Sequence, residues 1–259
     1  MQTQKIQQEI EKQKDQMIRA LMEIVSVPAI APDNGGEGEL RKAEKLTQIL
    51  ETIGFDKIER YDAQDKRVPS GKRPNITAYC NGQNTTQKLW IITHLDIVPP
   101  GEESFWTTAK PFQPALKEGR IYGRGTEDNG QSMIASVFAV KALRNLGLRP
   151  RITVALAFVA DEEQGSRYGI QHLISKGLFN TNDLILVPDG GNQDGTFIEI
   201  TEKSALWFRV RTVGKQIHAS MPDKGLNAHR AGMVYALAVD KMLHDKYSAK
   251  DPYFEPPES

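Results

Sequence analysis

The spacing of apolar side chains predicts alternating helices and strands along most of this chain. One amphipathic helix is expected within the first 25 residues, ended near Pro28, and a second from about Glu39 to Gly54. Strands are expected at 57–61, 75–80 and 88–98, the last of them almost wholly apolar. The first helix is predicted from apolar residues at helical intervals: Ile6, Ile10, Met17, Leu21 and Ile24.

The middle of the chain repeats a strand–helix–strand rhythm. The pattern predicts a helix at 131–147, the strand "RITVALAFV" at 151–159, a helix at 167–177 and a strand at 183–188. Strict alternation of this kind is typical of an α/β fold with a mostly parallel sheet and helices on both faces. The segment from Pro99 to Gly119 is expected to be a long irregular loop, a feature that is often functional.

The pattern changes after Asp189. Residues 195–214 alternate between apolar and polar with the period of strands, and 227–246 read as a helix. We therefore expect two domains: a larger one at 1–203 and a smaller, separately packed α+β domain at 204–259.

Charge and composition exclude several classes of function. The chain has 33 basic and 33 acidic residues, which gives no basic surface for nucleic acid or an anionic membrane. The only cysteine is Cys80, so the chain has neither an intrachain disulfide nor a thiolate zinc site. The first 25 residues are charged throughout, and no apolar run approaches the roughly 18 residues of a membrane span. A cytoplasmic enzyme or binding protein is expected.

Candidate chemistry gathers where the predicted strands end. In doubly wound sheets, ligands bind outside the carboxyl ends of the strands. Each such end here carries ionisable side chains: His94 and Asp96, then Asp128 before a helix, then Asp161, Glu162 and Glu163, then Asp189. Three adjacent acids at the end of a buried strand repel one another. Either a solvated turn or a bound cation would account for them.

Each of these residues has an ordinary structural interpretation when it is taken alone. Asp128 suits a helix N-cap, Asp189 a turn, His94 a buried polar position, and the glutamates a solvated edge. Taken together, they favour a divalent cation held by imidazole and carboxylate groups. Such ligands suit Zn²⁺, Mn²⁺ or Co²⁺.

Five motifs carry a family resemblance. The segments "HLDIVP", "GRGTEDNG", "DEEQGS", "VPDGG" and "GKQIHASMPDKGLNA", in this order and spacing, resemble the M20 family of metallopeptidases and deacylases. The resemblance covers the chain from about residue 20. It implies a zinc-exopeptidase-like catalytic domain, followed by the beginning of a lid and dimerisation domain.

The resemblance also implies a site with two Zn²⁺ ions, for which Co²⁺ or Mn²⁺ are alternatives. Asp128 would bridge the ions, His94 and Asp189 would bind one, and Glu163 the other. Asp96 would accept a hydrogen bond from the His94 ring, and Glu162 would be the general base.

The resemblance implies further features of the chain and its partners. A cis peptide bond is expected between Asp128 and Asn129. His218 would stabilise the oxyanion in the partner's active site, in a homodimer formed through the second domain, and Asn227 would help to bind substrate. The substrate would be a small peptide or an N-acyl amino acid.

The chain departs from the family pattern in one respect. A final histidine ligand of the second metal has no counterpart in these 259 residues, so we expect a truncated chain with impaired activity. A non-catalytic metal-binding or dimerisation module is the alternative function. A carbohydrate hydrolase that uses Glu162 and Glu163 as acid and base is disfavoured, because adjacent residues on an extended strand end point to opposite sides.

Overall fold

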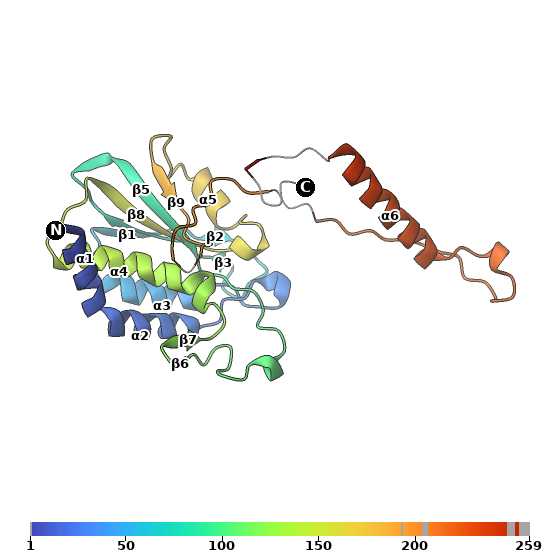
Figure 1. Cartoon of the computed structure of the whole chain (residues 1–259), viewed down its shortest axis with the longest axis horizontal. Coiled ribbons are helices and arrows are strands. Elements are labelled where there is room, and N and C mark those ends of the chain that lie inside the picture. Colours follow the sequence, from blue (N-terminus) through green and yellow to red (C-terminus); the bar gives the residue numbers. More distant parts are fainter. Residues whose placement is uncertain (1, 193, 204–206, 248–251, 254–259) are drawn as a thin grey trace. The chain divides into compact units, whose positions relative to one another are not determined.

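The chain forms two compact units in the computed structural model, residues 1–190 and 191–259. The structure describes residues 2–192, 194–203, 207–247 and 252–253, and Figure 1 shows them as ribbons. The domain boundary predicted before Ser204 falls at 204–206, outside the described residues, and stays a prediction.

The first unit contains a central five-stranded sheet in the order β1-β4-β8-β5-β9 and two small hairpins, β2–β3 and β6–β7. The strands are β1 (Lys57–Arg60), β2 (Ala63–Gln64), β3 (Lys72–Arg73), β4 (Ile76–Cys80), β5 (Asn84–His94), β6 (Ala115–Lys117), β7 (Arg120–Tyr122), β8 (Ile152–Val159) and β9 (Leu184–Leu186). The helices of this unit are α1 (Gln2–Lys12), α2 (Lys14–Val25), α3 (Leu40–Glu51), α4 (Ser132–Asn145) and α5 (Ile170–Ser175), with short turns of helix at Pro32–Asn34, Glu103–Phe105, Thr126–Gln131 and Glu162–Gln164.

Four of the five strands run in the same direction. β8 pairs in parallel with β5, and β5 in parallel with β9, whereas β4 is antiparallel to both β1 and β8. Only β4 therefore runs the other way, and the prediction of a mostly parallel α/β sheet is confirmed. The register places His94, the last residue of β5, opposite Val159, the last residue of β8. The carboxyl ends of these two strands therefore lie together.

Helices cover both faces of the sheet, as predicted (Figure 1). On one face, α2, α3 and α4 bury an apolar core that includes Ile24, Leu46 and Phe138 against Leu156 and Phe158 of β8. The opposite face is covered by α5 and the segment after it. Its core comprises Trp90, Ile92, Ala155, Ala157, Val159 and Leu173. Because side chains alternate along β8 and both faces of the sheet are covered, seven of its eight residues are apolar, the exception being Thr153.

Two helices occupy the N-terminal region where the periodicity predicts one. The break between α1 and α2 is Gln13, a buried residue whose N–H bonds to Ile10 at 2.9 Å instead of continuing the helical ladder. Its side-chain amide donates to the Glu9 carbonyl at 3.1 Å. Local side-chain bonds of this kind compete with the helix, and hydrophobic spacing does not reveal them.

The loop from Pro99 to Gly119 also differs in part from the expectation, because β6 lies inside it and pairs with β7. Within the described residues, no helix combines the length and apolar composition of a membrane span.

The described part of the second unit contains α6 (Ala228–Lys246), a short turn at Pro222–Lys224 and an isolated β-bridge between Lys215 and Leu226. The prediction of strands at 195–214 is wrong for the described part of that range, where no strand is assigned. A strand is defined by hydrogen bonds to a neighbouring strand, and the described residues of this range are not paired in a strand ladder. Their apolar side chains are exposed, with Trp207 93% accessible to solvent.

Candidate metal centre

The carboxyl ends of three strands converge on one acidic site in the first unit. β5 ends at His94, β8 leads into Glu162 and Glu163, and Asp189 follows β9. Asp128 reaches the same place from the irregular helical turn Thr126–Gln131 that precedes α4. The parallel arrangement of β5, β8 and β9 explains the convergence, because the segments that follow parallel strands leave the sheet at the same edge.

His94 lies at the centre of the site, and its side chain is almost fully buried. Its Nδ1 atom lies 3.0 Å from the carbonyl oxygen of Asp96, an arrangement in which Nδ1–H donates. Its Nε2 atom is 2.8 Å from an Asp128 oxygen and 3.6 Å from an Asp189 oxygen. With Nδ1 engaged as a donor, Nε2 is the ring atom available to a cation.

The charges of the site change the protonation of its members. Burial lowers the pKa of His94, but bonds to the carboxylates of Asp128 and Asp189 outweigh burial and raise it to about 12. The bond with His94 lowers the pKa of Asp189. Without a metal ion, the imidazole therefore holds a proton in the middle of the carboxylates.

Two sets of side chains have the composition and spacing of metal ligands. His94, Asp128 and Glu163 form one set, and His94, Glu162 and Asp189 form the other. The ligand atoms of each set lie within 4.8 Å of one another. In addition, Glu163 Oε1 is a buried oxygen without a hydrogen-bond partner. Such an atom lowers the stability of the fold unless a cation binds there.

Burial also acts on the two glutamates. It raises the pKa of Glu162, which lies near the negative charges of Asp189 and Asp96. Burial and the nearby charge of Asp128 raise the pKa of Glu163 to about 7. Carboxyl groups with raised pKa values exchange protons near neutral pH, as a general base requires.

Asp96 contacts both the histidine and the acidic turn. Its carbonyl oxygen lies 3.0 Å from Nδ1 of His94, and its carboxylate oxygen lies 3.6 Å from the same atom. The same carboxylate accepts the backbone N–H groups of Glu162 and Glu163, each at 3.0 Å. Asp96 therefore orients the two glutamates through their backbone, a role that the sequence did not predict.

Asn129 connects Asp128 with Asp189. The peptide bond between Asp128 and Asn129 is cis, as expected. The side-chain amide of Asn129 donates to an Asp189 oxygen, while Asn129 itself is buried. This bond fixes the Asp189 carboxylate beside His94.

His218 and Asn227 lie in the second unit, and each belongs to neither ligand set. The exposed His218 ring pairs with the Ser220 hydroxyl at 2.8 Å. The Asn227 side chain accepts from the Arg230 N–H at 3.0 Å and so caps the N-terminus of α6. Their roles in substrate binding stay predictions.

The structure adds two buried cations that the sequence analysis missed, Lys42 and Arg73. Burial lowers the pKa of Lys42 to about 8, although the charges of Asp96, Glu39 and Asp128 favour its protonated form. Lys42 lies beside Ala43 on the apolar face of α3. This position on the helix is the feature of the sequence that could have indicated its burial.

Comparison with known proteins places these residues in a family. Residues 90–253 match the model of peptidase family M20/M25/M40. A protein of Methanococcus maripaludis, named as an uncharacterized metallohydrolase, is 36% identical over 93% of this chain and 60% of its own length. A succinyl-diaminopimelate desuccinylase of Alkalilimnicola ehrlichii is 30% identical over 82% of this chain and 54% of its own length.

Solved structures agree with the fold. A dipeptidase of Saccharomyces cerevisiae has a TM-score of 0.61 and 24% identity, over 72% of this chain and 40% of that protein. A metallo-carboxypeptidase of Sulfolobus solfataricus has a TM-score of 0.53 and 25% identity, over 69% of this chain and 38% of its own. The chain thus spans about 60% or less of the length of these relatives.

Proposed function

Because the chain belongs to peptidase family M20/M25/M40, we propose that it supplies the catalytic metal centre of a hydrolase that cleaves an amide or peptide bond. The observation that carries this proposal is the pair of ligand sets that share His94 at the carboxyl ends of β5, β8 and β9. A solvated acidic edge would not bury a histidine among the carboxylates.

The donor set has the chemistry of a site for divalent cations, and we propose that it would hold two of them. By resemblance to the family, His94, Asp128 and Asp189 would hold one ion, and Asp128 and Glu163 would hold the other. This grouping differs from the two spatial sets, in which His94 lies with Asp128 and Glu163 or with Glu162 and Asp189. One imidazole and several carboxylates, with no thiolate, suit Zn²⁺, with Co²⁺ or Mn²⁺ as alternatives. Bound there, divalent cations supply Lewis acidity and lower the pKa of water.

Glu162 is the proposed general base. Its raised pKa allows it to take a proton from the attacking water and to return it to the leaving amine. Asp96 holds the Glu162 backbone at 3.0 Å and so keeps this carboxylate at the site. The geometry also permits Glu162 to be a ligand, because it belongs to the second set.

A small peptide or an N-acyl amino acid is the proposed substrate. The support comes from the names of the relatives, one a succinyl-diaminopimelate desuccinylase and the other a dipeptidase. We further propose that His218 and Asn227 contact substrate in a homodimer formed through the second unit. A metal-binding module without catalysis is the second candidate function.

The test compares Glu162→Gln with Glu127→Gln, a change at an exposed glutamate next to Asp128. The protein would be assayed with dipeptides and N-acyl amino acids, and its metal content measured by elemental analysis. We expect Glu162→Gln to lower kcat by about 10²–10⁴-fold with metal content unchanged. Glu127→Gln should match the wild type.

The other outcomes separate the alternatives. Loss of metal in Glu162→Gln would make Glu162 a ligand and leave the base unassigned. A wild-type protein that holds metal but hydrolyses none of these substrates would support the non-catalytic module. No bound metal in the wild type would overturn the proposed centre.

A further inference from the structure

A fully buried arginine lies beside the turn that carries the two glutamates. The Arg73 side chain, from β3, is 0% exposed. Its Nε donates to a Glu39 oxygen at 2.7 Å, and a second guanidinium nitrogen donates to the other Glu39 oxygen. A third nitrogen lies 3.4 Å from an Asp65 oxygen. An unpaired guanidinium in the protein interior would destabilise the fold, so Arg73 must keep its bonds to these carboxylates. The paired geometry therefore holds its side chain in one position.

Arg73 also contacts Asp161, the first residue of the acidic turn. One Asp161 oxygen lies 3.2 Å from the guanidinium, and the other accepts the Tyr168 N–H, also at 3.2 Å. One carboxylate thus joins the beginning of the turn to its end. Asp161 has a φ of 65°, in the left-handed region, which aspartate and asparagine tolerate better than most residues.

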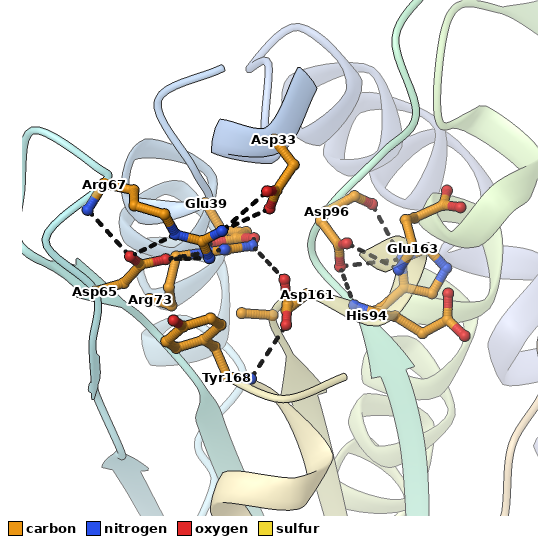
Figure 2. A network of polar contacts seen from close by, with 12 residues as sticks. Asp33, Glu39, Asp65, Arg67, Arg73, His94, Asp96, Asp161, Glu163 and Tyr168 are labelled. Carbon is orange, nitrogen blue, oxygen red and sulfur yellow. Dashed lines mark hydrogen bonds and ion pairs between the residues drawn. The ribbon is translucent and has the colours of Figure 1, made fainter. Parts of the chain in front are cut away.

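The two glutamates lie between this contact and a second one. Asp161 is bound by Arg73, and the next two N–H groups, those of Glu162 and Glu163, are bound by Asp96. Figure 2 shows Asp161 between the Arg73 cluster and the group formed by Asp96, His94 and Glu163. The backbone of the turn is therefore fixed from both sides.

We propose that Arg73 is a positioning residue that acts through Asp161 to hold Glu162 and Glu163 in the geometry of the metal centre. This inference rests on the proposed function, since it matters only if Glu163 binds metal and Glu162 acts as base. Arg73 itself touches neither the ligand atoms nor the reacting groups.

The test is a titration with Co²⁺ alone, followed by the visible absorption of the bound ion, on the metal-free protein. Asp161→Asn removes the charge that faces Arg73 and retains a residue that tolerates the left-handed backbone. We expect its Co²⁺ affinity to fall about 10–100-fold, with a changed absorption spectrum, as is usual when the support of a ligand is lost.

Asp65→Asn is the matched control. Asp65 is also buried and also faces Arg73, but its contacts are with Arg67 and Arg73 and not with the turn at 161–168. We expect wild-type Co²⁺ affinity and spectrum for this variant. An equal loss in both variants would mean that the network stabilises the domain in general, and it would overturn the proposal.

Thermal unfolding of each metal-free variant shows that it is folded. If Asp161→Asn does not fold, Arg73→Lys is tested in its place. Lysine keeps the positive charge but lacks the planar guanidinium, which can bind several carboxylate oxygens at once. The same loss of Co²⁺ affinity is then expected. A folded variant with wild-type Kd and spectrum would overturn the role of Arg73 and leave the metal centre intact. A wild-type protein that binds no Co²⁺ would instead overturn the proposed function.

Discussion

The Nε2 atom of His94 lies 2.8 Å from a carboxylate oxygen of Asp128. The other ring nitrogen faces the Asp96 carbonyl at 3.0 Å, and the pKa of the ring is raised to about 12. In the metal-free protein at neutral pH, both ring nitrogens therefore carry hydrogen. The proton on Nε2 occupies the direction in which a cation would bind.

Metal binding should release this proton. Only the neutral imidazole binds a cation, so we expect about one proton to leave His94 when an ion binds it near pH 7. Glu163, with a pKa of about 7, should release part of a further proton when it binds metal. Calorimetric titration with Zn²⁺ in two buffers of different ionisation enthalpy measures the number. Identical heats in the two buffers would contradict the protonated ring.

The buried amine of Lys42 should make stability depend on pH. Its pKa is about 8 in the folded protein and about 10.4 in an unfolded chain. Between these values the unfolded chain binds a proton that the folded protein lacks, so the free energy of unfolding rises with pH. The rise from this group is about 3 kcal/mol.

Urea unfolding of the metal-free protein at several pH values between about 7 and 10 measures this effect. Lys42→Met should remove the rise. Lys45→Met is the control on the same helix, because Lys45 is partly exposed and pairs with Glu23 at 3.7 Å. A wild-type slope equal to that of Lys42→Met would show that Lys42 keeps an ordinary pKa.

Asp183 should support the sheet without affecting the metal centre. Its carboxylate accepts the Trp90 indole N–H at 3.0 Å and the Lys88 N–H at 2.9 Å. Asp183→Ala leaves both donors unpaired at a partly buried place, and we expect it to lower the free energy of unfolding by about 2 kcal/mol. Asp33→Ala removes an exposed ion pair with Arg67 and should cost less than about 1 kcal/mol.

Denaturant unfolding followed by tryptophan fluorescence compares the two aspartate variants. Equal destabilisation by Asp33→Ala and Asp183→Ala would argue against the buried bond to Trp90. Zn²⁺ affinity should be unchanged in both variants.

Gly169 should be intolerant of any side chain. A Cβ atom at this position would lie 1.8 Å from the carbonyl oxygen of Ala160, just before the acidic turn. We expect Gly169→Ala to destabilise the protein by about 3 kcal/mol and to weaken metal binding, since the turn must move.

Gly177→Ala provides the comparison for Gly169→Ala. Gly177 has a positive φ of 70° but open space around it, so alanine there should cost only about 1 kcal/mol. A melting temperature for Gly169→Ala at or above that of Gly177→Ala would contradict the steric argument.

The convergence of the site could be predicted from the sequence for a physical reason. Apolar strands in a parallel sheet end at one edge, so residues that directly follow such strands are neighbours wherever they lie in the chain. His94 ends a strand of this kind, and Glu163 and Asp189 each come after one, although the three residues are separated by up to 95 residues. The structure brings all three into the two ligand sets.

Buried charges could not be predicted in the same way. Arg73 and Lys42 lie in segments that are otherwise charged, "GKRPN" and "LRKAEK", where lysine and arginine are usually exposed. Arg73 is paired with Glu39 and Asp161, which are distant from it in sequence. Lys42 lies near the charges of Asp96 and Asp128, which are distant from it as well. The alternating pattern at 195–214 predicted strands that the structure does not contain in the described part of that range. Periodicity indicates which side chains could share one face of a strand, but it does not indicate whether a neighbouring strand is present to pair with it.

The position of β8 in the sheet has a consequence for how the site responds to thermal fluctuation. β8 pairs along both edges, so its amide hydrogens should exchange with solvent only when the whole sheet opens. Asp161 lies two residues after it, so Glu162 and Glu163 are anchored to the most protected strand. Asp189 follows β9, whose three residues pair with β5 alone in the described chain and are at least half exposed. On warming, the Asp189 side of the centre should therefore loosen first, while the two glutamates remain in place.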